Sequence, residues 1–217
     1  MADEVEICNL ALSNIRAGSI NDLDEPSLQA QVCKLKYDFL RDRCLRDAVW
    51  NFNRSQVALA SIDVTIYNWA YAYSYPVTCL KIHRIIPAYE EVTGEASIIS
   101  SLIDSQVLPI TSQRRQVSYE IFNFSDVKVI GANETCLHID YARRVTDPNL
   151  FSEDFILAFS HLLSSEIAIP IVGVEKGRQL RSDEIQLYDE YIGSAVEADM
   201  NDGFLETGDS EYVTVRR

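Results

Sequence analysis

The hydrophobic pattern of this chain changes its period twice, and this change constrains the fold more than any other feature. Apolar residues recur at three- and four-residue spacings in residues 3–48 and again in 152–202, which indicates amphipathic helices. Between these segments Trp69, Tyr71, Tyr73 and Tyr75 stand at alternate positions, which is the period of a strand. We therefore expect an α+β protein, with a helical bundle body formed by both chain ends and an inserted β-rich, sandwich-like module.

The expected helices have recognisable ends. The first covers residues 3–16, and the second runs from about Glu25 to Ala48 with Asp24 as its cap and Pro26 in its first turn. A third helix begins after Ser152 and ends at Pro170 and Gly173, and a fourth spans residues 176–202. The second helix is expected to turn its main apolar stripe toward the core. That stripe consists of Leu28, Val32, Leu35, Phe39 and Val49, with Cys44 and Leu45 alongside it.

The middle of the chain favours strands. Branched and aromatic residues predict strands over 77–86, 97–102, 117–122, 127–130 and 136–141. The expected domains are a helical body of residues 1–66 and 146–203, a β-rich module of 67–145 and a C-terminal arm of 204–217. The arm is too polar to form a core, so we expect it to order only against a partner, by strand addition to a sheet edge.

Composition excludes several classes of function. A formal net charge of -14 opposes binding to DNA through counterion release. The 5 cysteines form no C-x-x-C pair and the 3 histidines lie on separate expected elements, which indicates reduced thiols and no metal site. The acidic start MADEVEICNLAL is unlike an export signal, and no apolar run reaches the roughly 18 residues needed to span a membrane.

No pattern of catalytic residues stands out. The chain lacks G-x-S-x-G and the glycine-rich loops that hold phosphates. Acid pairs such as Glu153-Asp154 resemble glycosidase carboxylates only superficially, because adjacent side chains point in different directions. The alternating aromatics of 67–75 could stack on sugars, although packing in a core or interface is the preferred interpretation. We expect no catalytic residue and no cofactor, and we interpret the chain as a protein that is not an enzyme.

Several segments together resemble one family. They are Ile7–Ser13 (ICNLALS), Ile20–Glu25 (INDLDE), Leu45–Phe52 (LRDAVWNF), Trp69–Pro76 (WAYAYSYP), Cys79–Ile82 (CLKI) and Tyr141-Ala142. In this order they are similar to the phage tail tubular protein A family, the head-to-tail adaptors of short-tailed phages. The resemblance implies a structural virion protein, made in the host cytoplasm and placed in the neck of the tail. It would form a dodecameric ring between the portal protein and the tail nozzle protein. The genome DNA would pass through the lumen without specific binding, and no membrane would be involved.

Two sets of residues are candidates for contacts with the portal or between subunits. The first is basic and lies on the second helix, where it forms either a solvated face or a salt-bridge face for the acidic C-terminal helix of a neighbour: Lys34, Arg41, Arg43 and Arg46. The second lies in the arm: Tyr212, Val213, Val215, Arg216 and Arg217. The strong negative charge predicts a monomer that assembles on the portal. Two other functions remain open, a tail-associated peptidoglycan hydrolase and a monomeric regulatory binding domain.

Overall fold

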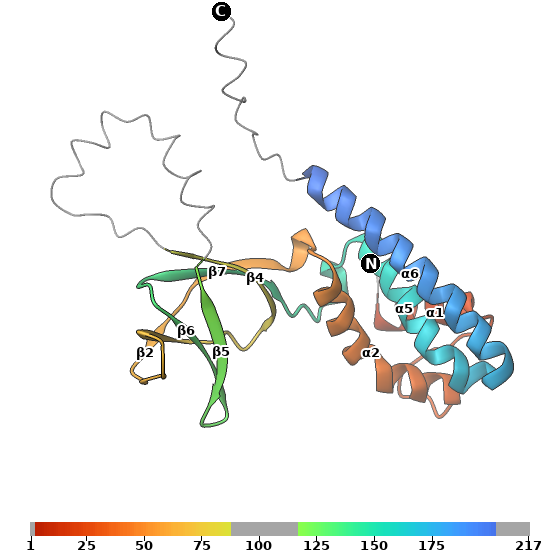
Figure 1. Ribbon diagram of the computed structural model, residues 1–217. Coiled ribbons are helices and arrows are strands. Elements are labelled where there is room, and N and C mark those ends of the chain that lie inside the picture. Colours follow the sequence, from red (N-terminus) through yellow and green to blue (C-terminus); the bar gives the residue numbers. More distant parts are fainter. Residues whose placement is uncertain (1–2, 88–116, 203–217) are drawn as a thin grey trace, which may run out of the picture. The chain divides into compact units, whose positions relative to one another are not determined.

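A computed structural model describes residues 3–87 and 117–202 of the chain (Figure 1). Helices and antiparallel sheets are both present, so the predicted α+β class is correct. The chain divides into two compact units, a helical unit of Met1–Phe52 with Asp147–Arg217 and a sheet unit of Asn53–Thr146. The sheet unit thus begins at Asn53, earlier than the boundary at residue 67 that the aromatic pattern suggests.

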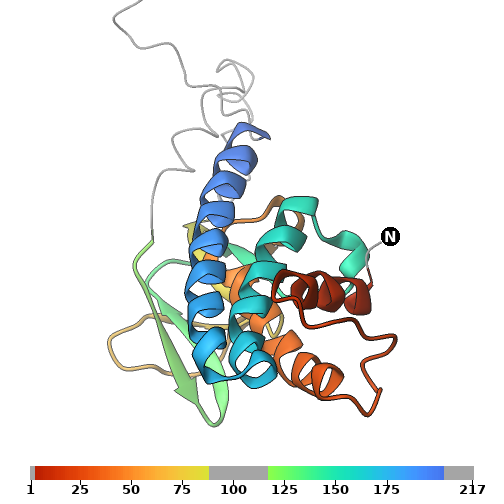
Figure 2. The ribbon, with the colours of Figure 1, turned by 90° about the vertical axis from the view of Figure 1, so that its right-hand side faces the viewer.

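The described residues of the helical unit form four long helices: α1 (Glu4–Asn14), α2 (Leu28–Asp47), α5 (Glu153–Val172) and α6 (Val174–Asp202). Helix α5 lies between α6 on one side and α1 and α2 on the other (Figures 1 and 2). It is the most apolar of the four, and its side chains Phe155, Phe159, Leu162, Leu163 and Ile167 are fully buried. By length and composition alone α5 could cross a membrane, but 56% of its apolar window is buried inside the protein, as in the core helix of a globular unit.

The first two helices each begin with a side-chain cap on the residue directly before the helix. Asp3 and Glu6 form a capping box at the start of α1. Helix α2 begins later than expected, and its cap is Ser27, whose hydroxyl accepts a hydrogen bond from the Ala30 N–H at 3.2 Å. The predicted cap Asp24 lies outside the helix and pairs with Lys34. Ser27, directly before the first helical residue, therefore caps α2 in place of Asp24, which lies three positions earlier.

Helices α5 and α6 form a tight antiparallel hairpin. Gly173 ends α5 with a φ of 96°, a conformation that glycine adopts without strain, and α6 starts at the next residue. Pro170 remains inside α5, so it does not end the helix as predicted. Gly177 lies against the backbone of Ile169, where an added Cβ would stand 2.7 Å from the Ile169 Cα. The close approach of the two helices therefore depends on glycine at 177.

An aromatic cluster joins the two chain segments of the helical unit. Trp50 and Phe52 come from the first segment, and the centroids of both rings lie within 5.2 Å of the Phe155 ring centroid in the second. Phe151 and Phe159 extend the cluster along the same side of α5. The indole N–H of Trp50 donates to the Cys44 carbonyl at 3.0 Å, so its one polar atom is satisfied in the core.

The sheet unit contains two antiparallel sheets among its described residues. One has the order β1 (Arg54–Ala58), β7 (Leu137–Arg143), β4 (Cys79–Pro87), and the other the order β2 (Ser61–Ile62), β3 (Tyr71–Ser74), β6 (Val127–Ala132), β5 (Tyr119–Phe124). Their buried residues form one core that includes Tyr73, Ile85, Ile130, Leu137 and Ile139. The predicted strand 97–102 lies outside the described residues.

The alternating aromatics of 67–75 do not share one environment. Tyr73 is buried and its hydroxyl donates to the Glu134 carbonyl at 2.6 Å, whereas Tyr71 is 42% exposed. Trp69 packs on the other side of the sheet, above Gly131, where an added Cβ would come within 2.8 Å of the indole. These contacts match packing within the unit, which was the preferred interpretation of the pattern.

Candidate functional site: the outward face of helix α2

Helix α2 carries a row of large apolar side chains that the described residues of the chain leave largely exposed. Leu28 is 53% exposed, Leu35 79% and Phe39 74%. These residues repeat at seven- and four-residue intervals, so they lie along one line of the helix surface, with the partly buried Val32 between them. We call Leu28, Leu35 and Phe39 the α2 stripe.

The α2 stripe contradicts the predicted orientation of the helix. Most residues of the expected core stripe are exposed, including Val49 at 42%, whereas Cys44 and Leu45, expected alongside the stripe, are buried. The buried face instead consists of Ala30, Cys33, Tyr37, Leu40, Arg41, Cys44 and Leu45. Small side chains on this face let α2 approach α5 closely, and the Tyr37 ring meets Phe159 edge-on at 5.1 Å. Helix α2 therefore has two apolar faces, and the face with Leu28, Leu35 and Phe39 is turned to the outside.

The basic residues predicted for a contact face are mostly paired within the chain. Lys34 pairs with Asp24, and Arg43 with Asp47 at 3.5 Å. Arg41 is only 4% exposed and binds both Asp38 and Asp42, so it is part of the body rather than of an accessible face. Arg46 is exposed in the last turn of α2 and also has an interaction within the chain. Arg43 and Arg46 thus mark the C-terminal end of the α2 stripe.

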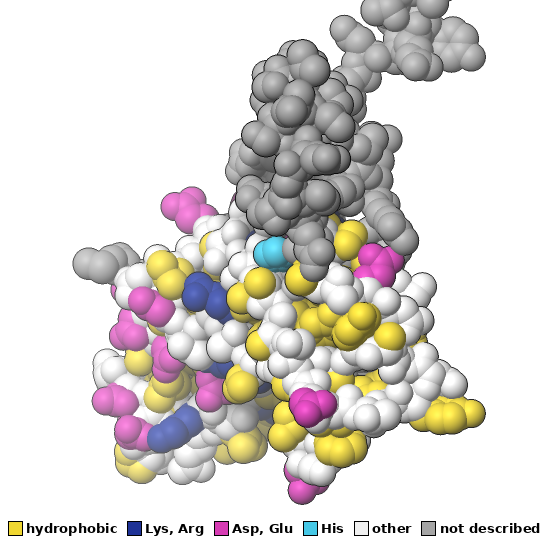
Figure 3. Space-filling view, turned by 90° about the vertical axis from the view of Figure 1, so that its left-hand side faces the viewer, with side chains coloured by type: hydrophobic (Ala, Val, Ile, Leu, Met, Phe, Trp, Pro, Cys, Tyr) yellow, Lys and Arg dark blue, Asp and Glu magenta, His cyan; other side chains and the backbone are white. Residues whose placement is uncertain are grey.

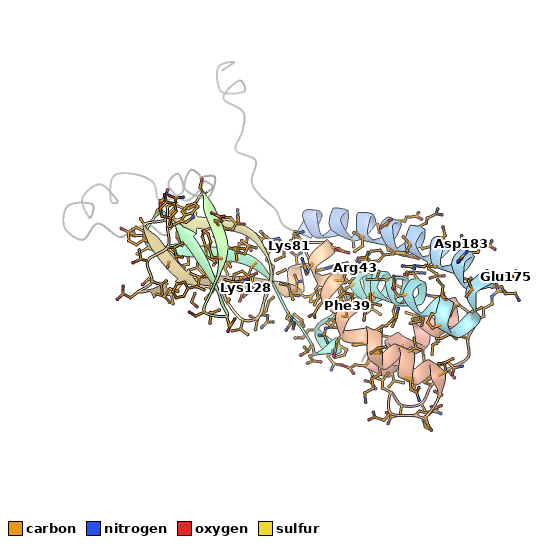
Figure 4. The ribbon with its side chains drawn as sticks, turned by 60° about the horizontal axis from the view of Figure 1, so that its bottom comes forward. Phe39, Arg43, Lys81, Lys128, Glu175 and Asp183 are labelled. Carbon is orange, nitrogen blue, oxygen red and sulfur yellow. The ribbon has the colours of Figure 1, made fainter. Side chains whose placement is uncertain are left out.

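The acidic residues of α6 lie mostly on its exposed side. Glu175, Asp183, Asp189 and Glu190 are all exposed, and no ion pair within the described residues engages them. Figure 4 shows Phe39 and Arg43 on α2, and Glu175 and Asp183 on α6. The same molecule therefore presents an apolar row that ends in arginines and, on another helix, a row of carboxylates. The predicted arm residues 212–217 lie outside the described part of the chain.

One histidine lies beside this helix pair. His161 Nδ1 of α5 is 2.8 Å from Glu184 Oε2 of α6, and the imidazole stacks on Tyr191 with centroids 5.0 Å apart. Both His161 and Glu184 are largely buried. The pair holds the two helices together, which agrees with the interpretation of His161 as a satisfied histidine of a core or interface.

The sheet unit has its own cluster of charged groups. The Asp140 carboxylate, 1% exposed, accepts hydrogen bonds from Arg54 at 2.6 Å and from Arg84 at 3.0 Å. Burial alone would raise the pKa of Asp140, but the hydrogen bonds and charges of the two arginines outweigh it and hold the pKa below its ordinary value. Burial also lowers the pKa of the nearby His83, which favours the neutral form of its ring. The cluster ties β1, β7 and β4 together across one sheet.

Further apolar side chains stand out on the sheet unit. In the view onto that unit, hydrophobic side chains gather between polar ones (Figure 3). Those most exposed are Tyr67 at 87% and Val77 at 95%, and Phe124 and Val127 flank a tight turn whose two residues both have positive φ. None of these is arranged in a row comparable to the α2 stripe.

Metal ligands and relatives give no further indication of a site. In the described part of the chain, no group of three or more His, Cys, Asp or Glu side chains could hold a metal ion. Comparison with protein-family models and with curated proteins finds no match for the chain.

Proposed function

We propose that this protein is a structural head-to-tail adaptor of a short-tailed phage, a ring subunit between the portal protein and the tail nozzle protein around the path of the DNA. The ordered motifs that resemble tail tubular protein A suggest this role. The structural observation that supports it best is the α2 stripe, because an apolar row with Leu35 at 79% and Phe39 at 74% exposure is typical of a surface that another protein covers.

The proposal includes an arrangement of the chain in which both ends form a helical bundle body and the β-rich part is an inserted module. The division into two units supports it, since residues from both ends belong to the helical unit. The hydrogen bond from Asn14 to Ser164, which bridges 150 positions of sequence, is one of the contacts that join those ends.

Charge supports a role beside DNA rather than on it. At a net charge of -14 the protein repels a phosphate backbone over the length of a screened field, about 8 Å at physiological salt. A channel wall that repels DNA weakly lets the genome move past without stopping. A protein that gathers on DNA would need a basic surface instead.

Electron microscopy of the purified chain mixed with the portal of the same phage tests the proposal. We expect a ring of this protein docked on one end of the portal, and no ring in the chain alone at the same concentration. A chain that stays monomeric in the presence of the portal contradicts the proposal. So does a lysis band in a peptidoglycan gel that one carboxylate substitution abolishes, since that result would identify a hydrolase.

A further inference from the structure

We infer that the α2 stripe of one copy docks on the side of the α5–α6 hairpin of the next copy. This inference rests on the proposed function and names the two surfaces through which neighbouring subunits would meet. A ring with one subunit type needs a heterologous contact, in which two different patches of the same molecule fit each other. The helical unit presents two such patches.

The first patch combines apolar and basic groups. Leu28, Leu35 and Phe39 form its apolar row, and Arg43 and Arg46 follow in the next turns. The pair between Arg43 and Asp47 is long, at 3.5 Å, and both side chains are about half exposed. Exposed pairs of this kind contribute little to stability, so Arg43 can exchange Asp47 for a carboxylate of another molecule.

The second patch combines apolar and acidic groups on the hairpin, and we call it the hairpin edge. Leu187 is 38% exposed on α6, with Asp183 and Glu190 one turn before and after it. Leu157 on α5 is 37% exposed and precedes His161, whose ring stacks on Tyr191, by one helical turn. The hairpin edge therefore consists of Leu157, Asp183, Leu187 and Glu190.

The hairpin edge differs from the side of α6 that contacts α2 in the same chain. Tyr188 of α6 donates to Asp47 of α2 at 2.8 Å, and Arg181 pairs with Glu166 of α5. Asp183 and Leu187 project from other positions around the helix, since successive residues are about 100° apart. The α2 stripe and the hairpin edge are thus separate surfaces, and each could contact a different neighbour at the same time.

Charge complementarity selects the hairpin edge among the exposed surfaces. The hairpin edge offers apolar contacts for Leu35 and Phe39. Its carboxylates, Asp183 and Glu190, have no ion pair within the described residues. Their negative charges complement the positive charges of Arg43 and Arg46. Two copies packed α2 against α2 would place identical apolar rows together but leave the acids of α6 unmatched. The second copy's hairpin edge satisfies both kinds of group.

Two charge reversals that complement each other test this inference. Arg43→Glu and Asp183→Lys should each weaken assembly on the portal about tenfold or more, because each places like charges across every contact. An equimolar mixture of the two variants should restore assembly. In a ring of alternating subunits, the introduced glutamate faces the introduced lysine at one contact, and Arg43 faces Asp183 at the next. Phe39→Ser should also weaken assembly, whereas Val77→Ser, at an exposed apolar site on the sheet unit, should not.

The readout is sedimentation velocity of the full chain with portal, with circular dichroism to confirm that each variant is folded. The inference is overturned if all single variants assemble like the wild type, or if the mixture of the two charge reversals does not restore assembly. Either result leaves the adaptor role intact. The chain could instead form dimers. If Phe39→Ser abolishes these dimers and Asp183→Lys leaves them unchanged, the α2 stripe belongs to an α2–α2 contact. A wild-type chain that never joins the portal contradicts the proposed function itself.

Discussion

At the scale of single residues, the structure depends on a few positions where only one side chain fits. Gly177 is the clearest, because the backbone of α5 occupies the space that a Cβ would need. Asp140 is another, since two arginines from different strands converge on its carboxylate. Neither requirement is visible in the sequence, where both residues stand in otherwise ordinary segments.

Replacing Gly177 by alanine should destabilise the helical unit. The new Cβ would meet the Ile169 Cα at 2.7 Å and force α5 and α6 apart, at a cost of about 1–3 kcal/mol. Gly193→Ala is the matched control, since an added Cβ there has nothing within 4 Å and alanine favours the helix by about 1 kcal/mol. Urea unfolding of both variants provides the measurement. Equal stabilities would mean that the hairpin does not need the close approach.

Asp140→Asn should destabilise the sheet unit at pH 7 by about 1–3 kcal/mol, because it leaves Arg54 and Arg84 without their carboxylate. The folded-state pKa of Asp140 is lowered, so its contribution is present above the ordinary value of about 3.9 and is lost as the pH falls through the folded-state pKa. The difference from wild type should therefore shrink toward pH 2. The exposed Asp63→Asn serves as control in the same unit, and a difference that stays constant with pH would refute the assignment.

At the scale of elements, the two apolar faces of α2 should differ in how much they contribute to stability. Leu35→Ser should change the free energy of unfolding by less than about 0.5 kcal/mol, because Leu35 is 79% exposed. Leu45→Ala, at 0% exposure on the opposite face, should cost about 2–5 kcal/mol. Thermal unfolding compares the two variants. The reverse order would restore the orientation predicted from the sequence.

The elements themselves could largely be predicted from the sequence, and their faces could not. Period and caps located all four long helices to within a few residues, and the strand candidates 77–86, 117–122, 127–130 and 136–141 overlap β4, β5, β6 and β7. The pattern failed on α2 because both of its faces are apolar, and periodicity alone does not rank Leu35 against Cys33 or Tyr37. It placed the cap of α2 at Asp24 because it weighed an acid before proline above the plain serine at 27.

The candidate site shows the same limit. The basic residues 34–46 were visible as a group, but the sequence did not show that Arg41 is buried or that Lys34 is engaged by Asp24. The sequence pattern showed the α2 stripe to be apolar and predicted it in the core. This prediction was wrong because the sequence does not show which face of α2 packs against α5. Only the three-dimensional packing shows whether an apolar row is buried in the core or exposed for contact with another molecule.

At the scale of the whole molecule, the two units should unfold separately. Leu162→Ala removes a fully buried side chain of α5, and Ile139→Ala one of β7. We expect the first variant to speed amide exchange across α1, α2, α5 and α6 and the second to speed it across the strands, because each core belongs to one unit. Hydrogen exchange with mass spectrometry resolves the segments. Faster exchange throughout the chain in both variants would show a single cooperative unit.

The contact between distant chain segments also has a consequence for biosynthesis. Asn14 bonds to Ser164 and Lys36 to Glu166, so α1 and α2 find their partner only after α5 has been made. At about 5–20 residues per second, the ribosome takes on the order of ten seconds to reach that point. The sheet unit's strands are made within this interval and are complete before α5, whereas Cys8, Cys33 and Leu45 lack the cover of α5 until the interval ends. We therefore expect the N-terminal helices to expose side chains of the later core while translation continues.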